Sequence, residues 1–217
     1  MEIRRTANAG ILLKLDGVTI LMDGVCREVK PYPVTPPEER TQLMKCWPDV
    51  IGFTHAHKDH YDPDYAARYM AQTGGVILGP EDLPRCPGSM ETRIVGGITV
   101  TPIPSRHIGA AGKTTSHVSF IVQGSSCLWF LGDSSPLLWK DRPDLPRPDV
   151  LVVPYAYATT PTGWTITRSL GAKHVILLHM PDREVDTLGL WNAVETVTSQ
   201  EKMPGFCILQ MGQTINI

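Results

Sequence analysis

The chain has 217 residues, 42% of them hydrophobic, and a formal net charge of -2 at pH 7. This length favours a single domain over residues 1–217 with a substantial core, and the slightly acidic charge gives no footprint for nucleic acid. No apolar stretch is long enough to span a bilayer, and none has the form of a signal peptide. The five scattered cysteines argue against disulfides and favour a cytoplasmic protein with reduced thiols.

The first predicted element is a hairpin between Gly10 and Asp23. Two apolar stretches, 11–15 and 18–22, flank Asp16-Gly17, which is a strong signal for a two-residue turn. Asp23 closes the second strand. Its side chain either forms a turn or supports a metal site from behind, and the sequence alone does not decide between these roles.

The hydrophobic pattern is lost over residues 26–48. Four prolines between positions 31 and 37 exclude a long helix there, although a short helix over 38–45 is compatible with the sequence. We interpret this segment as a surface excursion that forms a wall of the site that follows it.

The central stretch of the chain follows the apolar run 50–53, which predicts a buried strand. His55 and His57 then point to the same side of extended backbone, and Asp59 and His60 follow as the chain turns. One His-x-His pair could arise by chance, but four candidate ligands within six residues indicate a metal site. Imidazole and carboxylate suit zinc and similar divalent ions.

A helix is predicted from Pro63 to about residue 72, because Asp62 is a natural N-cap and Gly74-Gly75 ends the pattern. This structural role is sufficient for Asp62, so it is not assigned as a ligand. Further helices are predicted over 165–170 and 188–199, and strands over 76–78, 92–95, 98–103, 117–122, 127–131, 150–153, 174–178, 207–211 and 214–217.

Three of these strands lead into further candidate ligands: His107, Asp133 and His179. Each alone would be an ordinary turn residue, but three at equivalent positions indicate that the strand ends converge with the central stretch. His117 and His174 begin strands and are expected to be structural. Trp129 and Trp164 are expected to pack in the core.

The run Thr54-His55-Ala56-His57-Lys58-Asp59-His60, followed by His107, Asp133 and His179, resembles the metallo-β-lactamase superfamily over nearly the whole chain. The segments His60-Tyr61-Asp62-Pro63 and Leu131-Gly132-Asp133 resemble its compact branch, which is related to ascorbate-6-phosphate lactonase and to the phospholipase D that releases N-acylethanolamines. The resemblance implies an α+β fold, a four-layer αββα sandwich with metals at one edge.

The resemblance also implies a ligand set for two divalent ions: His55, His57 and His107 for the first, Asp59, His60 and His179 for the second, and Asp133 bridging both. Zinc is the first expectation, and manganese and iron are compatible with the same ligands. Two ions sharing a hydroxide would lower its pKa towards ~7 and create a nucleophile. Asp59 and Asp133 are the expected catalytic residues, with Asp59 orienting the attacking hydroxide.

The expected reaction is hydrolysis of a small ester, lactone or phosphodiester. Arg106, Lys113 and Tyr155 lie beside predicted ligands and are candidates for binding an anionic substrate. The alternatives are a mononuclear iron oxygenase of the persulfide dioxygenase type, an RNA-processing nuclease and a metal-binding protein without catalysis. The sequence does not define the substrate, because the loops 26–48, 105–116 and 155–164 would shape its pocket.

Overall fold

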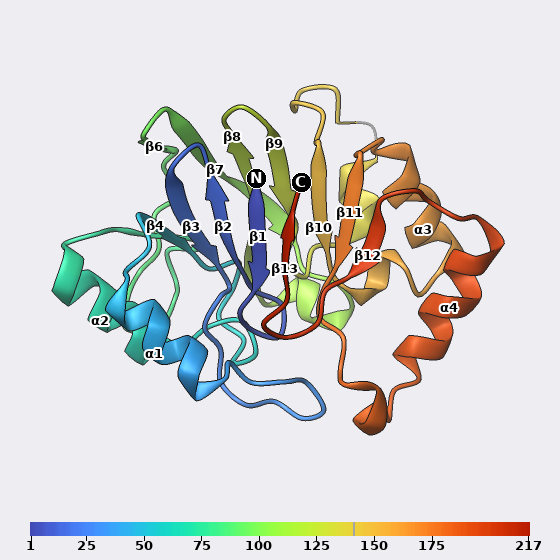
Figure 1. Cartoon of the computed structure of the whole chain (residues 1–217), viewed down its shortest axis with the longest axis horizontal. Coiled ribbons are helices and arrows are strands. Elements are labelled where there is room, and N and C mark those ends of the chain that lie inside the picture. The colour runs from blue at the N-terminus through green and yellow to red at the C-terminus, as the bar shows by residue number, and fades with distance from the viewer. Residues whose placement is uncertain (141) are drawn as a thin grey trace.

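The computed structural model describes residues 1–140 and 142–217. They form two facing mixed β-sheets with helices on both outer faces (Figure 1). The first sheet has the order β13 (Thr214–Asn216), β1 (Glu2–Arg5), β2 (Ile11–Leu15), β3 (Val18–Met22), β4 (Val50–Gly52) and β5 (Ile77–Leu78). The second has the order β12 (Phe206–Ile208), β11 (His174–Leu177), β10 (Val150–Val153), β9 (Cys127–Phe130), β8 (Ser116–Gln123), β7 (Ile98–Arg106) and β6 (Arg93–Val95).

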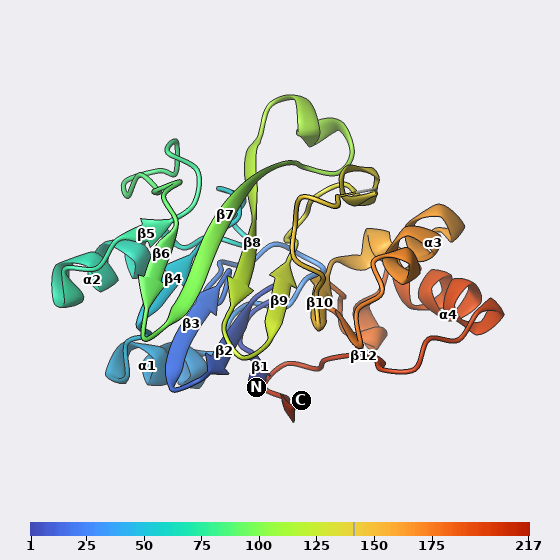
Figure 2. The same cartoon turned by 90° about the horizontal axis from the view of Figure 1, so that it is seen from above.

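Three layers of apolar side chains hold the sheets and helices together. The inner layer joins both sheets, because one cluster of buried side chains includes Ile20 from the first sheet and Phe120 from the second. The helices α1 (Pro37–Lys45) and α2 (Pro63–Thr73) cover the first sheet, and α3 (Pro161–Ser169) and α4 (Leu190–Gln200) cover the second (Figures 1 and 2). This is the predicted four-layer αββα sandwich. No helix in the described ranges has the length and apolar character needed to cross a membrane.

Several local predictions are confirmed. The strands of the first hairpin pair in the expected register, with Leu13 opposite Ile20. The Asp62 side chain accepts hydrogen bonds from the backbone N–H groups of Asp64 and Tyr65, and α2 ends at Gly74, whose φ is 66°. The 26–48 segment contains one short helix, α1, as its prolines allow.

Three elements differ from the predictions. The strand β1 was not predicted, because it is short and two of its four residues are arginines. The helix α3 begins at Pro161 rather than Thr165, because the Thr160 side chain caps it. The strand β7 continues to Arg106 through two prolines. Beyond Val100 it pairs with β8 but no longer with β6, so a proline, which has no N–H to donate, is tolerated there on the unpaired side of the strand.

The strand directions bring the predicted site to one edge. The strand β8 is antiparallel to both β7 and β9, while β9, β10 and β11 are parallel. The carboxyl ends of β7, β9 and β11 therefore lie at the same edge of the second sheet. His107 comes one residue after β7, Asp133 three residues after β9 and His179 two residues after β11.

Candidate metal centre

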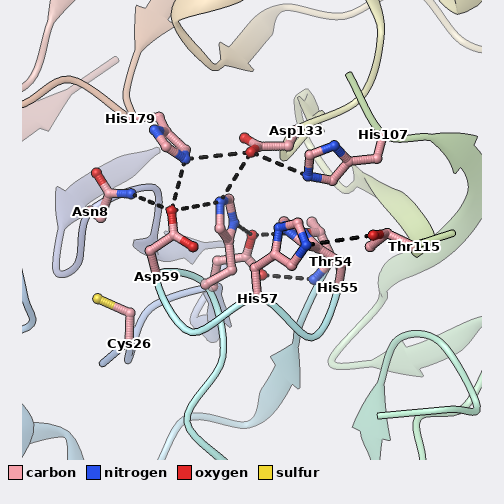
Figure 3. Close-up of polar contacts among 12 residues, drawn as sticks. Asn8, Cys26, Thr54, His55, His57, Asp59, His107, Thr115, Asp133 and His179 are labelled. Atoms are coloured by element: carbon pink, nitrogen blue, oxygen red, sulfur yellow. Dashed lines mark hydrogen bonds and ion pairs between the residues drawn. The ribbon is translucent and has the colours of Figure 1, made fainter. Parts of the chain in front are cut away.

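The seven predicted ligands converge at this edge (Figure 3). They form three overlapping groups, in each of which one nitrogen or oxygen per residue lies within 4.8 Å of the others. The groups are His55, His57 and His107; His55, His60 and Asp133; and Asp59, His60 and His179.

Asp133 lies between the groups. Its Oδ2 is 3.5 Å from Nε2 of His60, 3.6 Å from Nε2 of His107 and 3.4 Å from Nε2 of His179. Atoms bound to one tetrahedral zinc at its usual bond lengths are about 3.3 Å apart, so these separations suit shared ligation. The preceding Gly132 has a φ of 52°, and a Cβ there would lie 2.5 Å from the Thr54 side chain. Only glycine brings Asp133 this close to the central stretch.

Asp59 completes the opposite side of the cluster. Its Oδ2 is 3.1 Å from Nε2 of His179 and accepts a 3.3 Å hydrogen bond from Nδ2 of the buried Asn8. Burial alone would raise the pKa of Asp59, but the adjacent His179 imidazole and the charge of His60 lower it to about 2. This carboxylate is therefore ionised at neutral pH, as a metal ligand must be.

The charges within the cluster favour a bound cation. Burial works against an ionised Asp133, yet the neighbouring charges of His179 and His60 hold its pKa well below the usual value. Burial likewise opposes protonation of His60, but Asp133 and Asp23 raise its pKa well above the usual value. Burial and repulsion by neighbouring histidines lower the pKa of His55, which keeps it neutral. Without a metal, protonated histidines such as His60 would balance the negative charge of Asp133. A bound divalent ion would supply that positive charge instead.

An outer set of contacts orients the imidazoles. Nδ1 of His60 lies 2.8 Å from Asp23 Oδ2, and the same carboxylate accepts hydrogen bonds from the backbone N–H and hydroxyl of Thr54. The Thr54 hydroxyl in turn accepts from Nδ1 of His55 at 2.9 Å. Of the two roles considered for Asp23, these contacts favour support of the histidines, because they engage Nδ1 of His60 and of His55 and leave the Nε2 of both rings free for a metal.

The residues present fit a metal. The Nε2 atoms of His55, His60, His107 and His179 are buried and have no hydrogen-bond partner among the described residues, and the same holds for Nδ1 of His179 and Oδ1 of Asp133. An unsatisfied buried polar atom costs about 1–3 kcal/mol, and six in one cluster need a partner that several of them share. Nitrogen and oxygen donors of this kind suit zinc, manganese or iron.

Comparison with known families decides the affiliation. Residues 2–179 match the family described as the beta-lactamase superfamily domain. The chain belongs to the metallo-β-lactamase superfamily. A comparison with curated proteins finds no match.

Solved structures with the same fold share little sequence with this superfamily member. A protein from Veillonella parvula, described as a possible metal-dependent hydrolase, has a TM-score of 0.73 and 16% identity, covering 100% of this chain and 99% of the other. The isothiocyanate hydrolase from Delia radicum gut bacteria has a TM-score of 0.68 and 13% identity, with 100% and 99% covered. CmlA, a diiron β-hydroxylase from Streptomyces venezuelae, has a TM-score of 0.68 and 16% identity, with 100% and 54% covered. These similarities establish the fold alone.

The predicted substrate-binding residues separate into two sets. The Tyr155 ring lies 5.4 Å from the His179 ring, at the cluster. Arg106 and Lys113 are exposed, and no polar contact joins either side chain to the seven ligands within the described ranges. Tyr32, which was not predicted, meets His179 edge-on at 4.4 Å. It comes from the 26–48 segment, which thus forms a wall of the site as expected.

His117 contacts the site, contrary to the expectation of a purely structural role. Its Nε2 accepts a 3.0 Å hydrogen bond from the backbone N–H of Asp133, and its Nδ1 lies 2.7 Å from the Ser105 hydroxyl. The hairpin register could have revealed this, because Phe120 pairs with Phe130 and the same register places position 117 opposite 133. His174 lies at the amino end of β11, the opposite end from His179.

Replacing His117 by glutamine is expected to make stability less sensitive to acid. Burial lowers the pKa of His117 from 6.5 to about 3, so on acidification the unfolded chain takes up a proton before the folded one does. The stability contribution is complete above pH 6.5 and is lost as the pH falls towards 3, at about 1.4 kcal/mol per unit. Urea unfolding at pH 7 and pH 5 should show a loss smaller by about 2 kcal/mol in the variant. Equal losses in the two proteins would contradict this.

Replacing Asn8 by alanine is expected to weaken one metal subsite. The substitution removes the donor to Asp59 but keeps the Asn8 carbonyl, which accepts from the His179 N–H and from Arg5. Losing such a supporting contact costs about 10–100-fold in metal affinity, and competition with a chelating dye would measure it. The matched control is Thr6→Val, because the buried Thr6 hydroxyl has no partner within the described ranges. Unchanged affinity in the Asn8 variant would show that the amide does not support Asp59.

Proposed function

We propose that this superfamily member is a dinuclear metal-dependent hydrolase, built as a single domain over residues 1–217. The observation that carries the proposal is the position of Asp133 Oδ2 between imidazole nitrogens from three different segments. His55, His57 and His107 would hold one divalent ion, Asp59, His60 and His179 the other, and Asp133 both. The ions would supply a hydroxide at neutral pH and polarise the bond to be cleaved.

Other side chains would bind and orient the substrate. The Asp59 carboxylate, ionised and fixed by Asn8, is placed to accept a hydrogen bond from the attacking water. Tyr32 and Tyr155 come from different loops and flank the same imidazole of His179. In this proposal their hydroxyls would donate hydrogen bonds to a substrate oxygen, while Arg106 and Lys113 would attract an anionic substrate from the rim.

We further propose a small ester, lactone or phosphodiester as substrate, in line with the resemblance to the lactonase-like branch. Zinc is the expected metal, with manganese or iron as the alternatives. The five unpaired cysteines support a cytoplasmic location. All seven predicted ligands belong to the cluster. A mononuclear iron oxygenase would need fewer of them, so their full number disfavours that alternative.

The test begins with metal analysis of protein purified without added metal. We expect close to two zinc or manganese ions per chain, and turnover on a panel of lactones, nitrophenyl esters and bis-nitrophenyl phosphate. Chelation should stop that turnover and metal should restore it. One iron per chain with oxygen consumption would favour the oxygenase instead. Failure to bind any metal after reconstitution would overturn the ligand assignment.

A further inference from the structure

A second candidate site lies between α1 and α2, and its lining shares no residue with the metal centre. It is a depression of about 480 Å³ lined by Arg40, Asp64, Ala67, Arg68, Ala71 and Arg85. The α2 residues recur at helical spacing and form one stripe of that helix. The two helices are packed together, since the Tyr65 hydroxyl donates to the Leu43 carbonyl. Figures 1 and 2 show both helices on the outer face of the first sheet.

The carboxylates at this depression are outnumbered by guanidinium groups. The buried Asp62 pairs with Arg40 at 2.6 Å and lies 3.6 Å from Arg27. Asp64 accepts from Arg27 at 2.6 Å and is also paired with Arg85. Three arginines thus share two carboxylates, so this network alone carries one excess positive charge.

Arg68 adds a second excess charge. It is exposed on α2, and its guanidinium forms no ion pair in the described ranges, where its one polar contact is the Met44 sulfur at 3.8 Å. The whole chain carries a net charge of -2, so the local excess of two positive charges runs against the overall balance. The local positive charge is therefore a feature of this depression and not of the protein surface as a whole.

The backbone at Arg85 is a second, independent sign of a built site. Arg85 has a φ of 68°. Among residues 1–140 and 142–217, the other non-glycine residues with positive φ are Asp16 in a hairpin turn and Asp23 and His179 at the candidate metal centre. Such a conformation costs of order 1 kcal/mol or more for a residue with a side chain. The loop is anchored beside it, because the Tyr61 hydroxyl donates to the Pro84 carbonyl at 2.7 Å. The strained residue is thus an arginine held beside the depression.

We propose that this depression binds a small-molecule phosphate monoester. A monoester carries nearly two negative charges at neutral pH, which matches the local excess. Guanidinium groups donate paired hydrogen bonds to phosphate oxygens in a geometry that lysine does not offer. Arg68 from α2 and Arg85 from the loop after β5 both line the depression and are the residues expected to hold the phosphate. The proposal does not depend on the hydrolase proposal, because it concerns binding only.

The test is an amide NMR titration of the zinc-loaded protein with phenyl phosphate and with inorganic phosphate at constant ionic strength. We expect saturable shifts for the amides of residues 67–71, 85 and 86. Arg68→Gln should weaken binding at least tenfold, and Arg68→Lys should weaken it severalfold because it keeps the charge and loses the fork. The matched control is Lys45→Gln, an exposed charge on α1 outside the lining, which should change affinity less than twofold.

Three outcomes would overturn the proposal. The first is the absence of saturable shifts on α2. The second is a response confined to residues 54–60, 107, 133 and 179, which would place the phosphate at the metal centre. The third is equal binding by wild type and Arg68→Gln. Since the exposed Arg68 forms no ion pair among the described residues, its variants are expected to fold, and a thermal melt would verify that.

Discussion

Replacing Asp133 by alanine is expected to lower hydrolytic turnover by about a thousandfold or more. The Asp133 carboxylate is the group that approaches three imidazoles at 3.4–3.6 Å. Without it, neither ion would keep its full ligand set, and the histidines would lose the charge that balances them. Steady-state kinetics together with metal content per chain would measure both effects. We expect fewer than two ions per chain in the variant.

Two matched variants sharpen this experiment. Asp133→Asn keeps the shape of the side chain but removes its charge, and it should fail nearly as completely as alanine. Asp144→Ala removes an exposed carboxylate that pairs with Arg142, and it should leave turnover within twofold of wild type. Full activity in Asp133→Ala would contradict the bridging role. A loss of turnover with two ions still bound would assign Asp133 to the chemistry rather than to metal retention.

The clustering of the seven predicted ligands could be foreseen because most of them are marked locally in the sequence. His55, His57, Asp59 and His60 follow one strand, and His107 follows another, so the strand pattern alone locates them. Strands that run in the same direction within a sheet have their carboxyl ends at the same edge, which brings the residues after them together. The same local logic located α2, whose N-cap and terminal glycine are both visible in the sequence.

The supporting residues could not be predicted, because they depend on contacts between distant segments. Asn8 meets Asp59 from a turn fifty-one positions earlier, and nothing near it in the sequence marks that contact. Tyr32 reaches His179 from a proline-rich loop that has no periodic pattern. The strand β1 lies between its neighbour β2 and the distant β13, where Ile3 is opposite Ile215 near the other end of the chain. Such long-range pairings leave no local signal.

Removing the metals is expected to lower the free energy of unfolding by about 4 kcal/mol or more. A ligand present at 1,000 times its dissociation constant stabilises the folded state by about 4.1 kcal/mol. The apoprotein must also bury six polar atoms of the cluster without hydrogen-bond partners among the described residues. Urea unfolding at pH 7, with and without a chelator, would measure the change as a shift in midpoint at constant slope.

The Asp133→Ala protein provides the decisive comparison for that measurement. Its metal centre is already impaired, so a chelator should shift its unfolding midpoint much less than it shifts the wild-type midpoint. An equal shift in both proteins would place the stabilising metal elsewhere. An unchanged wild-type midpoint would mean that the imidazoles and carboxylates tolerate each other without an ion, and the unpartnered nitrogens would then need water or protons as their partners.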